Sequence, residues 1–350
     1  MSQLTKLPPI SDQAMPEKLP AIAARFSLLL SLLAFTFVLN VCLGEINLTP
    51  QNALQAVFNP TSDVDAGIVD MLWQIRLPRL LSAFAVGAGL AVSGYLLQSL
   101  SRNFLADPYL TGVSSGAGLS IAVAMVLGLD FSFLPLAALA GGLASSLLVA
   151  LMSRTSAGIS VTRLLLSGVA VSAVCGSLIT LMITVFPDGP GIQGLFFWLA
   201  GSLSGRGWLE LQPAAIYITA ALGCAFALSK PLRLLSLGQE SAASLGLNVP
   251  LMQWLILAIA VILCGACVAL SGIVGFVGLI APYFARRLFG SDQRWHLLSS
   301  ICIGGILVLI ADLAARTVAP GQELPLGTLL SLIGAPFFLW LIIKQKGESM

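Results

Sequence analysis

The amino-acid sequence predicts an all-α polytopic membrane protein with about ten transmembrane helices, and three observations support that fold class. Hydrophobic residues make up 57% of the chain and charged residues only 9%, whereas soluble domains carry roughly 25% charged residues. The apolar residues gather in runs of about 20, the length that a helix needs to cross a bilayer. Basic residues fall mainly in alternate connections between these runs. This pattern excludes a globular enzyme with a single membrane anchor.

The chain is expected to form one membrane domain between two short tails. Residues 1–24 are polar and rich in proline, a composition typical of disorder, and should form a cytoplasmic tail. Residues 25–346 form the transmembrane domain, and residues 347–350 form the second tail. The first apolar run ends at Gly44-Glu45 and lacks the small-x-small pattern of a cleavage site. We therefore expect a membrane span there and not a removable signal peptide.

Ten apolar runs have lengths near those of membrane spans, and several are shortened or interrupted by glycine. The second run is rich in glycine and alanine, small residues that let helices pack closely in lipid. The seventh and eighth runs meet at Ser271-Gly272 with almost no loop between them. In order, the expected spans are residues 25–44, 79–101, 112–129, 133–153, 162–186, 212–229, 251–270, 272–289, 296–317 and 326–344.

The distribution of positive charge predicts which side of the membrane each connection faces. Cytoplasmic connections carry an excess of Lys and Arg. With the N-terminus inside, this excess is strong, because few of the 17 basic residues fall outside. We expect a multi-pass protein of the cell inner (plasma) membrane with both termini in the cytoplasm. The basic residues left on the outer side are Arg76, Arg79, Arg206 and Arg316.

One cytoplasmic connection is long and has a helical pattern of its own. Gly238 and Gly246 divide residues 231–248 into two short helical pieces, roughly 232–237 and 239–245. The second piece carries small residues, which let another protein approach closely. The stretch is either a docking element for a soluble partner or an ordinary interhelical loop. Long loops with their own structure tend to be functional, which favours docking.

The sequence offers little support for an enzyme. It contains no GxxxxGK[ST] or HExxH pattern, so it has neither a P-loop nor this type of zinc site. Cys264 and Cys267 have CxxC spacing, but they lie in an apolar run with no second pair, which favours helix packing. His296, the single histidine, lies at a predicted membrane edge and is a weak candidate for any role. A net charge of +2 is too small to indicate a nucleic-acid partner.

Ionisable residues at the outer side allow two interpretations each. Asp312 lies inside a predicted span and one helical turn before Arg316, so the two side chains can pair on one face. An acid within a span is otherwise a candidate functional site. Arg76 and Arg79 flank the start of the second span. They either anchor the helix by snorkelling or form a basic patch that receives carboxylates from a partner.

Several short blocks together resemble the FecCD-type permeases of ABC importers, which carry iron–siderophores, haem and cobalamin. The likeness runs from about residue 70 to the C-terminus. Phe104 stands where that family usually has proline, and Tyr283 where it usually has histidine. In chain order, the blocks are RLPR (76–79), NFLADP (103–108), GVSSGA (112–117), LG (237–238), AASLG (242–246), GFVGLI (275–280) with Pro282, GSD (290–292), ELPLG (323–327) and GAPFF (334–338).

The resemblance implies the architecture of a type II ABC importer permease. Two ten-helix subunits, usually identical, would form a dimer with the translocation path at their interface. Two ABC ATPase subunits would bind on the cytoplasmic side, and one substrate-binding protein would bind outside. The permease subunit itself would be non-catalytic, with no cofactor and no metal ligand, because a separate ATPase subunit hydrolyses ATP.

The resemblance also implies three groups of functional residues. The first couples to the ATPase, with the small side chains of Ala242, Ala243 and Ser244 expected at the contact. The second forms an inner gate at two cytoplasmic turns, and the third receives glutamates of the binding protein. In that order, the groups are Leu237, Gly238, Gln239, Glu240, Ala242, Ala243, Leu245 and Gly246; Asn103, Phe104, Leu105, Val161 and Thr162; and Arg76, Arg79 and Arg316.

The cargo and one other class of transporter stay open at this stage. Ferric siderophore is the first expectation, with cobalamin (vitamin B12) and haem as alternatives. An ion-coupled secondary transporter would need ionisable groups at the membrane midplane and no ATPase partner. A membrane enzyme would need a catalytic cluster. Co-purification of an ATPase with this chain would separate the importer from both.

Overall fold

The computed structural model describes residues 19–44, 48–58, 65–156, 158–187, 192–290, 293–319 and 321–348. Within these ranges, eight helices are long and apolar enough to cross a membrane. The shorter helices α5 (Val113–Val126) and α13 (Val277–Phe289) complete the set of about ten that the sequence predicts. The all-α polytopic architecture is thereby confirmed.

Most helices begin and end within a few residues of the predicted spans. The first helix begins at Leu19, so it includes residues 19–24, which the sequence assigned to the tail. Residues 1–18 of that tail and residues 349–350 of the C-terminal tail lie outside the described residues. The eight long helices are α1 (Leu19–Cys42), α4 (Leu77–Ser101), α6 (Leu134–Met152), α7 (Val161–Val185), α9 (Trp208–Ala227), α12 (Val249–Ser271), α14 (Gln293–Thr317) and α15 (Leu326–Glu348).

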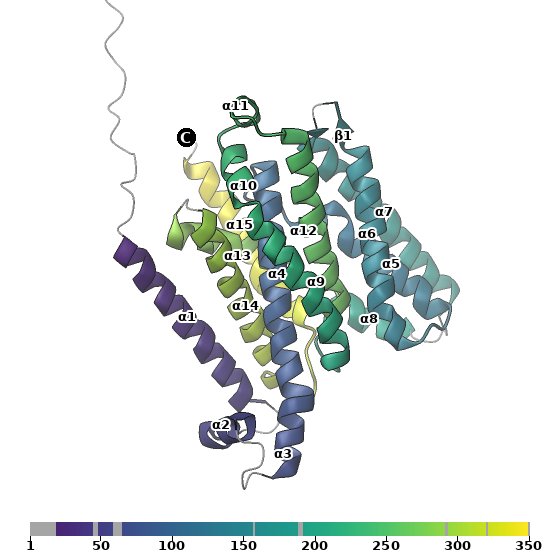
Figure 1. Ribbon diagram of the computed structural model, residues 1–350. Coiled ribbons are helices and arrows are strands. Elements are labelled where there is room, and N and C mark those ends of the chain that lie inside the picture. The colour runs from purple at the N-terminus through teal and green to yellow at the C-terminus, as the bar shows by residue number, and fades with distance from the viewer. Residues whose placement is uncertain are drawn as a thin grey trace, which may run out of the picture.

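The short elements gather at the two ends of the helix bundle (Figure 1). One end, here the α10–α11 end, carries α10, α11, a β-hairpin and the C-terminal part of α15. The opposite end, here the α2–α3 end, carries α2 and α3. The short elements are α2 (Pro50–Phe58), α3 (Ala66–Asp70), the π-helical turn η1 (Met71–Arg76), the 3-10 turns η2 (Pro108–Thr111) and η3 (Phe131–Phe133), β1 (Arg154–Thr155), β2 (Gly158–Ile159), α8 (Ile192–Ala200), α10 (Ser229–Ser236) and α11 (Gln239–Ser244).

Helix α4 forms the centre of the bundle and packs against α9, α12, α13 and α14 (Figure 1). Its small residues allow these close crossings. A Cβ atom at Gly87 would overlap the backbone of Gly304 on α14, and one at Gly94 would overlap the carbonyl of Gly278 on α13. Glycine at these positions brings backbones together where no side chain would fit, as the sequence predicted for this helix.

Helix α13 begins five residues later than the predicted eighth span, and the backbone explains why. Gly272 (φ 68°) and Phe276 (φ 66°) both have positive φ, which no continuing helix allows. Residues 272–276, between α12 and α13, are therefore not helical. Within this stretch, the backbone N–H and C=O of Val274 are hydrogen-bonded by a side chain. The Tyr109 hydroxyl accepts from Val274 N at 2.9 Å and donates to Val274 O at 2.7 Å.

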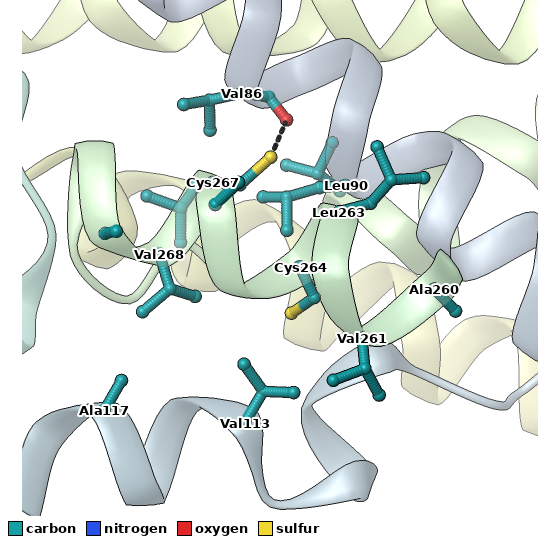
Figure 2. Packing of buried hydrophobic residues seen from close by; sticks show 14 of the residues in the cluster. Val86, Leu90, Val113, Ala117, Ala260, Val261, Leu263, Cys264, Cys267 and Val268 are labelled. Atoms are coloured by element: carbon teal, nitrogen blue, oxygen red, sulfur yellow. Dashed lines mark hydrogen bonds between the residues drawn. The ribbon is translucent and has the colours of Figure 1, made fainter. Parts of the chain in front are cut away.

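The two cysteines of the CxxC motif are packing residues, as the sequence favoured. Cys264 and Cys267 lie on α12 and are completely buried among apolar side chains of α4, α5 and α12 itself (Figure 2). Their sulfur atoms point to different sides of the helix. The Cys267 thiol donates to the carbonyl of Val86 at 3.6 Å, so it fills the α4–α12 crossing.

Candidate functional site

The predicted coupling stretch forms two short helices joined by a glycine turn. α10 is anchored in the bundle by Leu232 and Leu235, which are buried. Gly238 has φ 127°, a conformation that side-chain-bearing residues rarely adopt, and it turns the chain into α11. Leu237, at the turn, is 62% exposed, and Leu245, just after α11, is 61% exposed. An apolar surface therefore projects from the α10–α11 end.

One residue assigned to the ATPase contact does not lie on that surface. Ala242 is fully buried, and its backbone N–H donates to Gly238 O at 2.8 Å. Its neighbour Ala243 is exposed. The prediction that Ala242 touches a partner is thus wrong, because α11 turns this side chain toward α12 and the core. The exposed members of the group are Leu237, Gln239, Glu240, Ala243, Leu245 and Gly246, whereas Gly238 is half-buried.

The first predicted gate turn follows α4 and is held in a defined shape. Asn103 accepts a hydrogen bond from the Leu105 backbone N–H at 2.9 Å through its side-chain oxygen, which forms an Asx turn. Phe104 is 47% exposed, and the guanidinium of Arg286 lies 3.8 Å from its ring centroid. Arg102, next to the turn, donates to the carbonyl of Leu235 on α10 at 2.7 Å.

The second predicted gate turn lies at the start of α7. Ser160 caps this helix by accepting from Arg163 N, and Val161 and Thr162 follow it directly. The β-hairpin before the cap is fixed to another element, because Ile159 N donates to the side-chain oxygen of Gln253 at 2.9 Å. Gln253 lies in the first turns of α12, the helix that follows α11.

Hydrogen bonds thus connect the predicted coupling stretch, and the helix that follows it, to the two predicted gate turns. Arg102 joins α10 to the turn after α4, and Gln253 joins the start of α12 to the hairpin before α7. The sequence did not identify either residue. A signal was present for Gln253, because an amide within an apolar span needs a buried partner. The Arg102 contact has no comparable sequence signal.

At the α2–α3 end, the three predicted docking arginines are brought together. Arg76 is 5% exposed and donates to the carbonyl of Val41 on α1. Arg79 forms a salt bridge to Asp312 at 2.9 Å and a second one to Glu323 at 2.7 Å. Residues far apart in the sequence therefore form one cluster that joins α1, α4, α14 and the α14–α15 connection.

Arg316 completes this group, here the outer cluster, named for the side of the membrane that the sequence predicts for it, and is paired within the chain. Its Nε lies 3.1 Å from Asp312 Oδ2, which confirms the predicted one-turn pair. Its Nη2 donates to the Asn40 side chain at 2.8 Å. Asp312 is fully buried and is shared between Arg79 and Arg316. Two guanidinium groups therefore balance the charge of this carboxylate. Of the two interpretations that the sequence allowed, the structure shows the one in which Asp312 pairs with Arg316.

Glu323 is the member of the outer cluster that the sequence did not identify. Its side chain is 36% exposed, so it is the accessible acid of the cluster. Burial alone would raise the pKa of Glu323, but the hydrogen bond and charge of Arg79 outweigh that effect and hold the pKa below its ordinary value. Glu323 also borders a cavity of about 670 Å³, which Ser202, Ser204 and Arg206 line as well.

Comparison with known proteins assigns the chain to a family. Residues 32–344 match the FecCD transport family. The chain belongs to this family. Over 291 residues it is 40% identical to the hemin transport system permease protein HmuU of Yersinia pestis, covering 80% of this chain and 86% of that protein.

Two further FecCD-related permeases are named for different cargoes. The Fe(3+)-citrate import system permease protein YfmE of Bacillus subtilis is 37% identical over 308 residues, covering 87% of this chain and 90% of that protein. The vitamin B12 import system permease protein BtuC of Vibrio cholerae is 37% identical over 330 residues, covering 91% and 93%. All three relatives are named as permeases of transport or import systems.

A solved structure agrees with this assignment. A chain described as an inward-facing conformation and assigned to the metal-chelate type of ABC transporter superposes with a TM-score of 0.82 at 31% identity. The match covers 92% of this chain and 99% of that one. The fold of that chain therefore extends over nearly the whole of this one.

Proposed function

We propose that this FecCD-family chain is the membrane permease subunit of an ABC importer and forms the translocation path for a metal chelate. The observation that carries the proposal is the exposed α10–Gly238–α11 element, which Arg102 joins to a turn at the same end of the bundle. An importer driven by a separate ATPase needs such a contact, because the force of ATP binding must reach the gate from outside the membrane domain.

The proposed class of cargo, a metal chelate, is supported by the chemistry that the relatives' cargoes share. Haem, ferric citrate and vitamin B12 are bulky metal complexes, and the named relatives import all three. We propose a ferric siderophore as the first choice, with cobalamin and haem as alternatives. Such a cargo would arrive bound to a substrate-binding protein, so specificity would lie mainly in that partner.

The proposed assembly places a partner at each end of the bundle. Two copies of this chain enclose the path, and two ABC ATPase subunits contact the α10–α11 end. That end faces the cytoplasm together with both termini, in agreement with the excess of Lys and Arg near it. One substrate-binding protein docks on the α2–α3 end. The whole complex lies in the inner (plasma) membrane.

The proposed mechanism passes force from the ATPase contact to two gate turns. Closure of the ATPase subunits would push on α11 and α10, and the buried Leu232 and Leu235 would pass this movement from α10 into the bundle. The Arg102–Leu235 bond would carry this movement to Asn103, Phe104 and Leu105. The Gln253–Ile159 bond would carry it to Val161 and Thr162. Alternating access would follow.

The outer cluster is proposed to receive an acidic side chain of the binding protein. Within it, Arg79 and Arg316 pair with the carboxylates of Asp312 and Glu323. Arg76 and Arg79 are buried, which limits direct contact between a partner's side chain and their guanidinium groups. We propose that a partner carboxylate takes the place of Glu323, the accessible acid, because bidentate pairing suits a guanidinium.

Nucleotide-dependent cross-linking tests the gate and the dimer together. In the complex with its ATPase, Val161→Cys should form a cross-link between the two permease copies in one nucleotide state and much less in the other. The matched control is Gly176→Cys, farther along the same helix and away from the turn. Cross-linking at Val161 that never changes with nucleotide would contradict the gate, and failure of any ATPase to co-purify would contradict the importer.

A further inference from the structure

The connection between α8 and α9 borders the cavity of about 670 Å³ that Glu323 also lines. We call it the Trp198–Arg206 cavity, after two of its lining side chains. Arg206 is the fourth arginine that the sequence places on the outer side, and the proposed function has no role for it. The cavity adjoins the outer cluster, because Glu323 belongs to both. Its volume is typical of sites that enclose a small organic ligand.

Trp198 supplies the first unsatisfied donor of the cavity. It lies on α8, and only 7% of its surface is exposed. Its indole Nε1 has no hydrogen-bond partner among the residues that the structure describes. A buried indole N–H normally has an acceptor, because leaving it unpaired costs free energy. The indole of Trp208, for comparison, donates to the Trp73 carbonyl at 2.7 Å. Trp198 therefore lacks an acceptor that a ligand in the cavity can supply.

Arg206 supplies a second donor, which is charged. It is half-buried, and its guanidinium forms no hydrogen bond or salt bridge with any residue of the described ranges. Burial lowers the pKa of Arg206, and the charge of Glu210 offsets this effect only in part. The Glu210 carboxylate already accepts from Gly207 N at 2.9 Å, which caps the start of α9. A ligand carboxylate would give the guanidinium the partner that the chain does not provide.

The rest of the lining suits an oxygen-rich ligand with an apolar body. Ser202 and Ser204 bring hydroxyl groups to the cavity, and the ring of Phe197, which is 66% exposed, brings apolar surface. Glu323 does not repel an anion as a free acid would, because its carboxylate lies 2.7 Å from the Arg79 guanidinium. Unused donors and a balanced acid therefore favour a ligand that brings acceptor oxygens.

We propose that the Trp198–Arg206 cavity binds a carboxylate group of the transported chelate. The inference rests on the proposed function and narrows its cargo to chelates with free carboxylates. Arg206 holds the carboxylate through two parallel hydrogen bonds, and Trp198 Nε1 donates to a further oxygen of the ligand. Ferric citrate, haem and siderophores of the carboxylate type carry such groups. Vitamin B12 presents amides in their place and fits the cavity less well.

Equilibrium dialysis of the purified full chain in nanodiscs, without binding protein or ATP, tests the cavity. The probes are ferric citrate and cyanocobalamin, which has no free carboxylate. Ferric citrate should bind at least about tenfold more tightly than cyanocobalamin, and Arg206→Gln should weaken its binding at least about tenfold. Trp198→Phe, which keeps an aromatic ring but removes the N–H, should weaken it about fivefold. The matched control, Trp208→Phe, removes an N–H that has a protein acceptor and should leave binding unchanged.

Four results would overturn the proposal. The first is no binding of ferric citrate by the wild type, and the second is equal binding of the two probes. The third is an equal loss in Trp198→Phe and Trp208→Phe. The fourth is an Arg206→Gln variant that binds ferric citrate normally but has lost affinity for the binding protein, which would make the cavity a protein contact.

A second variant covers the case in which Arg206→Gln does not fold. Arg206→Lys keeps the charge but cannot pair bidentately, so it should bind ferric citrate more weakly than the wild type, and equal binding would overturn the proposal. The dialysis needs neither the ATPase nor transport, so the two proposals fail separately. Failure of any ATPase to co-purify contradicts the importer, whereas absent binding to a chain that supports ATP-driven uptake contradicts the cavity alone.

Discussion

At the residue scale, Asp312 holds the outer cluster together. It is fully buried and accepts from two arginines of different helices, so its removal would leave both guanidinium groups without their main counter-charge. We expect Asp312→Asn to lower the free energy of unfolding by about 3 kcal/mol. Asp130→Asn, at an exposed position in the α5–α6 connection, should change it by less than about 0.5 kcal/mol. Equal thermal unfolding midpoints for the two variants would contradict the structural role of Asp312.

Glu323 offers a test of docking at the same scale. Its carboxylate pairs with Arg79 and, in our proposal, competes with the carboxylate of the binding protein. Glu323→Gln should therefore raise the affinity for the binding protein by about two- to fivefold, as expected for one exposed ion pair, and the gain should shrink as salt is added. The measurement is surface plasmon resonance with the intact permease–ATPase complex. An unchanged or lower affinity at low salt would argue against competition at Arg79.

At the element scale, close helix crossings at α4 determine the fold. Gly94→Ala would push a methyl group into the carbonyl of Gly278, so we expect a loss of about 2 kcal/mol of stability or more. Gly176→Ala on α7 meets no atom within 4 Å and should be neutral or slightly stabilising, because alanine favours helix. Thermal unfolding of both variants in detergent measures the difference. Similar unfolding midpoints would show that α4 and α13 can move apart at this crossing with little loss of stability.

The sequence predicted where the helices lie better than it predicted which of their side chains are buried. Glycine positions such as Gly238 marked the turn between α10 and α11 correctly, because few other residues tolerate positive φ. The pattern could not separate Ala242 from Ala243, since both are small and the piece is only six residues long. The start of α13 was also missed, because Phe276 has a left-handed backbone conformation and packs against Gly334, a contact distant in sequence.

At the scale of the whole molecule, the unpredicted features are contacts between segments distant in sequence. Arg102 reaches Leu235, Gln253 reaches Ile159, and Arg79 reaches Glu323. Each needs two segments to be positioned by the complete bundle, and no local pattern encodes such a meeting. The positions of the coupling stretch and the three arginines were predicted, but the bonds that connect or restrain them came from the structure.

The central claim is that α10 and α11 transmit the action of an ATPase to the transport path. ATP-driven uptake of a ferric siderophore into proteoliposomes containing the complete importer tests it most directly. Ala243→Trp places a bulky side chain on the exposed face of α11, whereas Ala220→Trp places one on an exposed position of α9. We predict that Ala243→Trp inserts normally but loses uptake by about tenfold or more, while Ala220→Trp retains it. Uptake by Ala243→Trp at the wild-type rate would contradict the account.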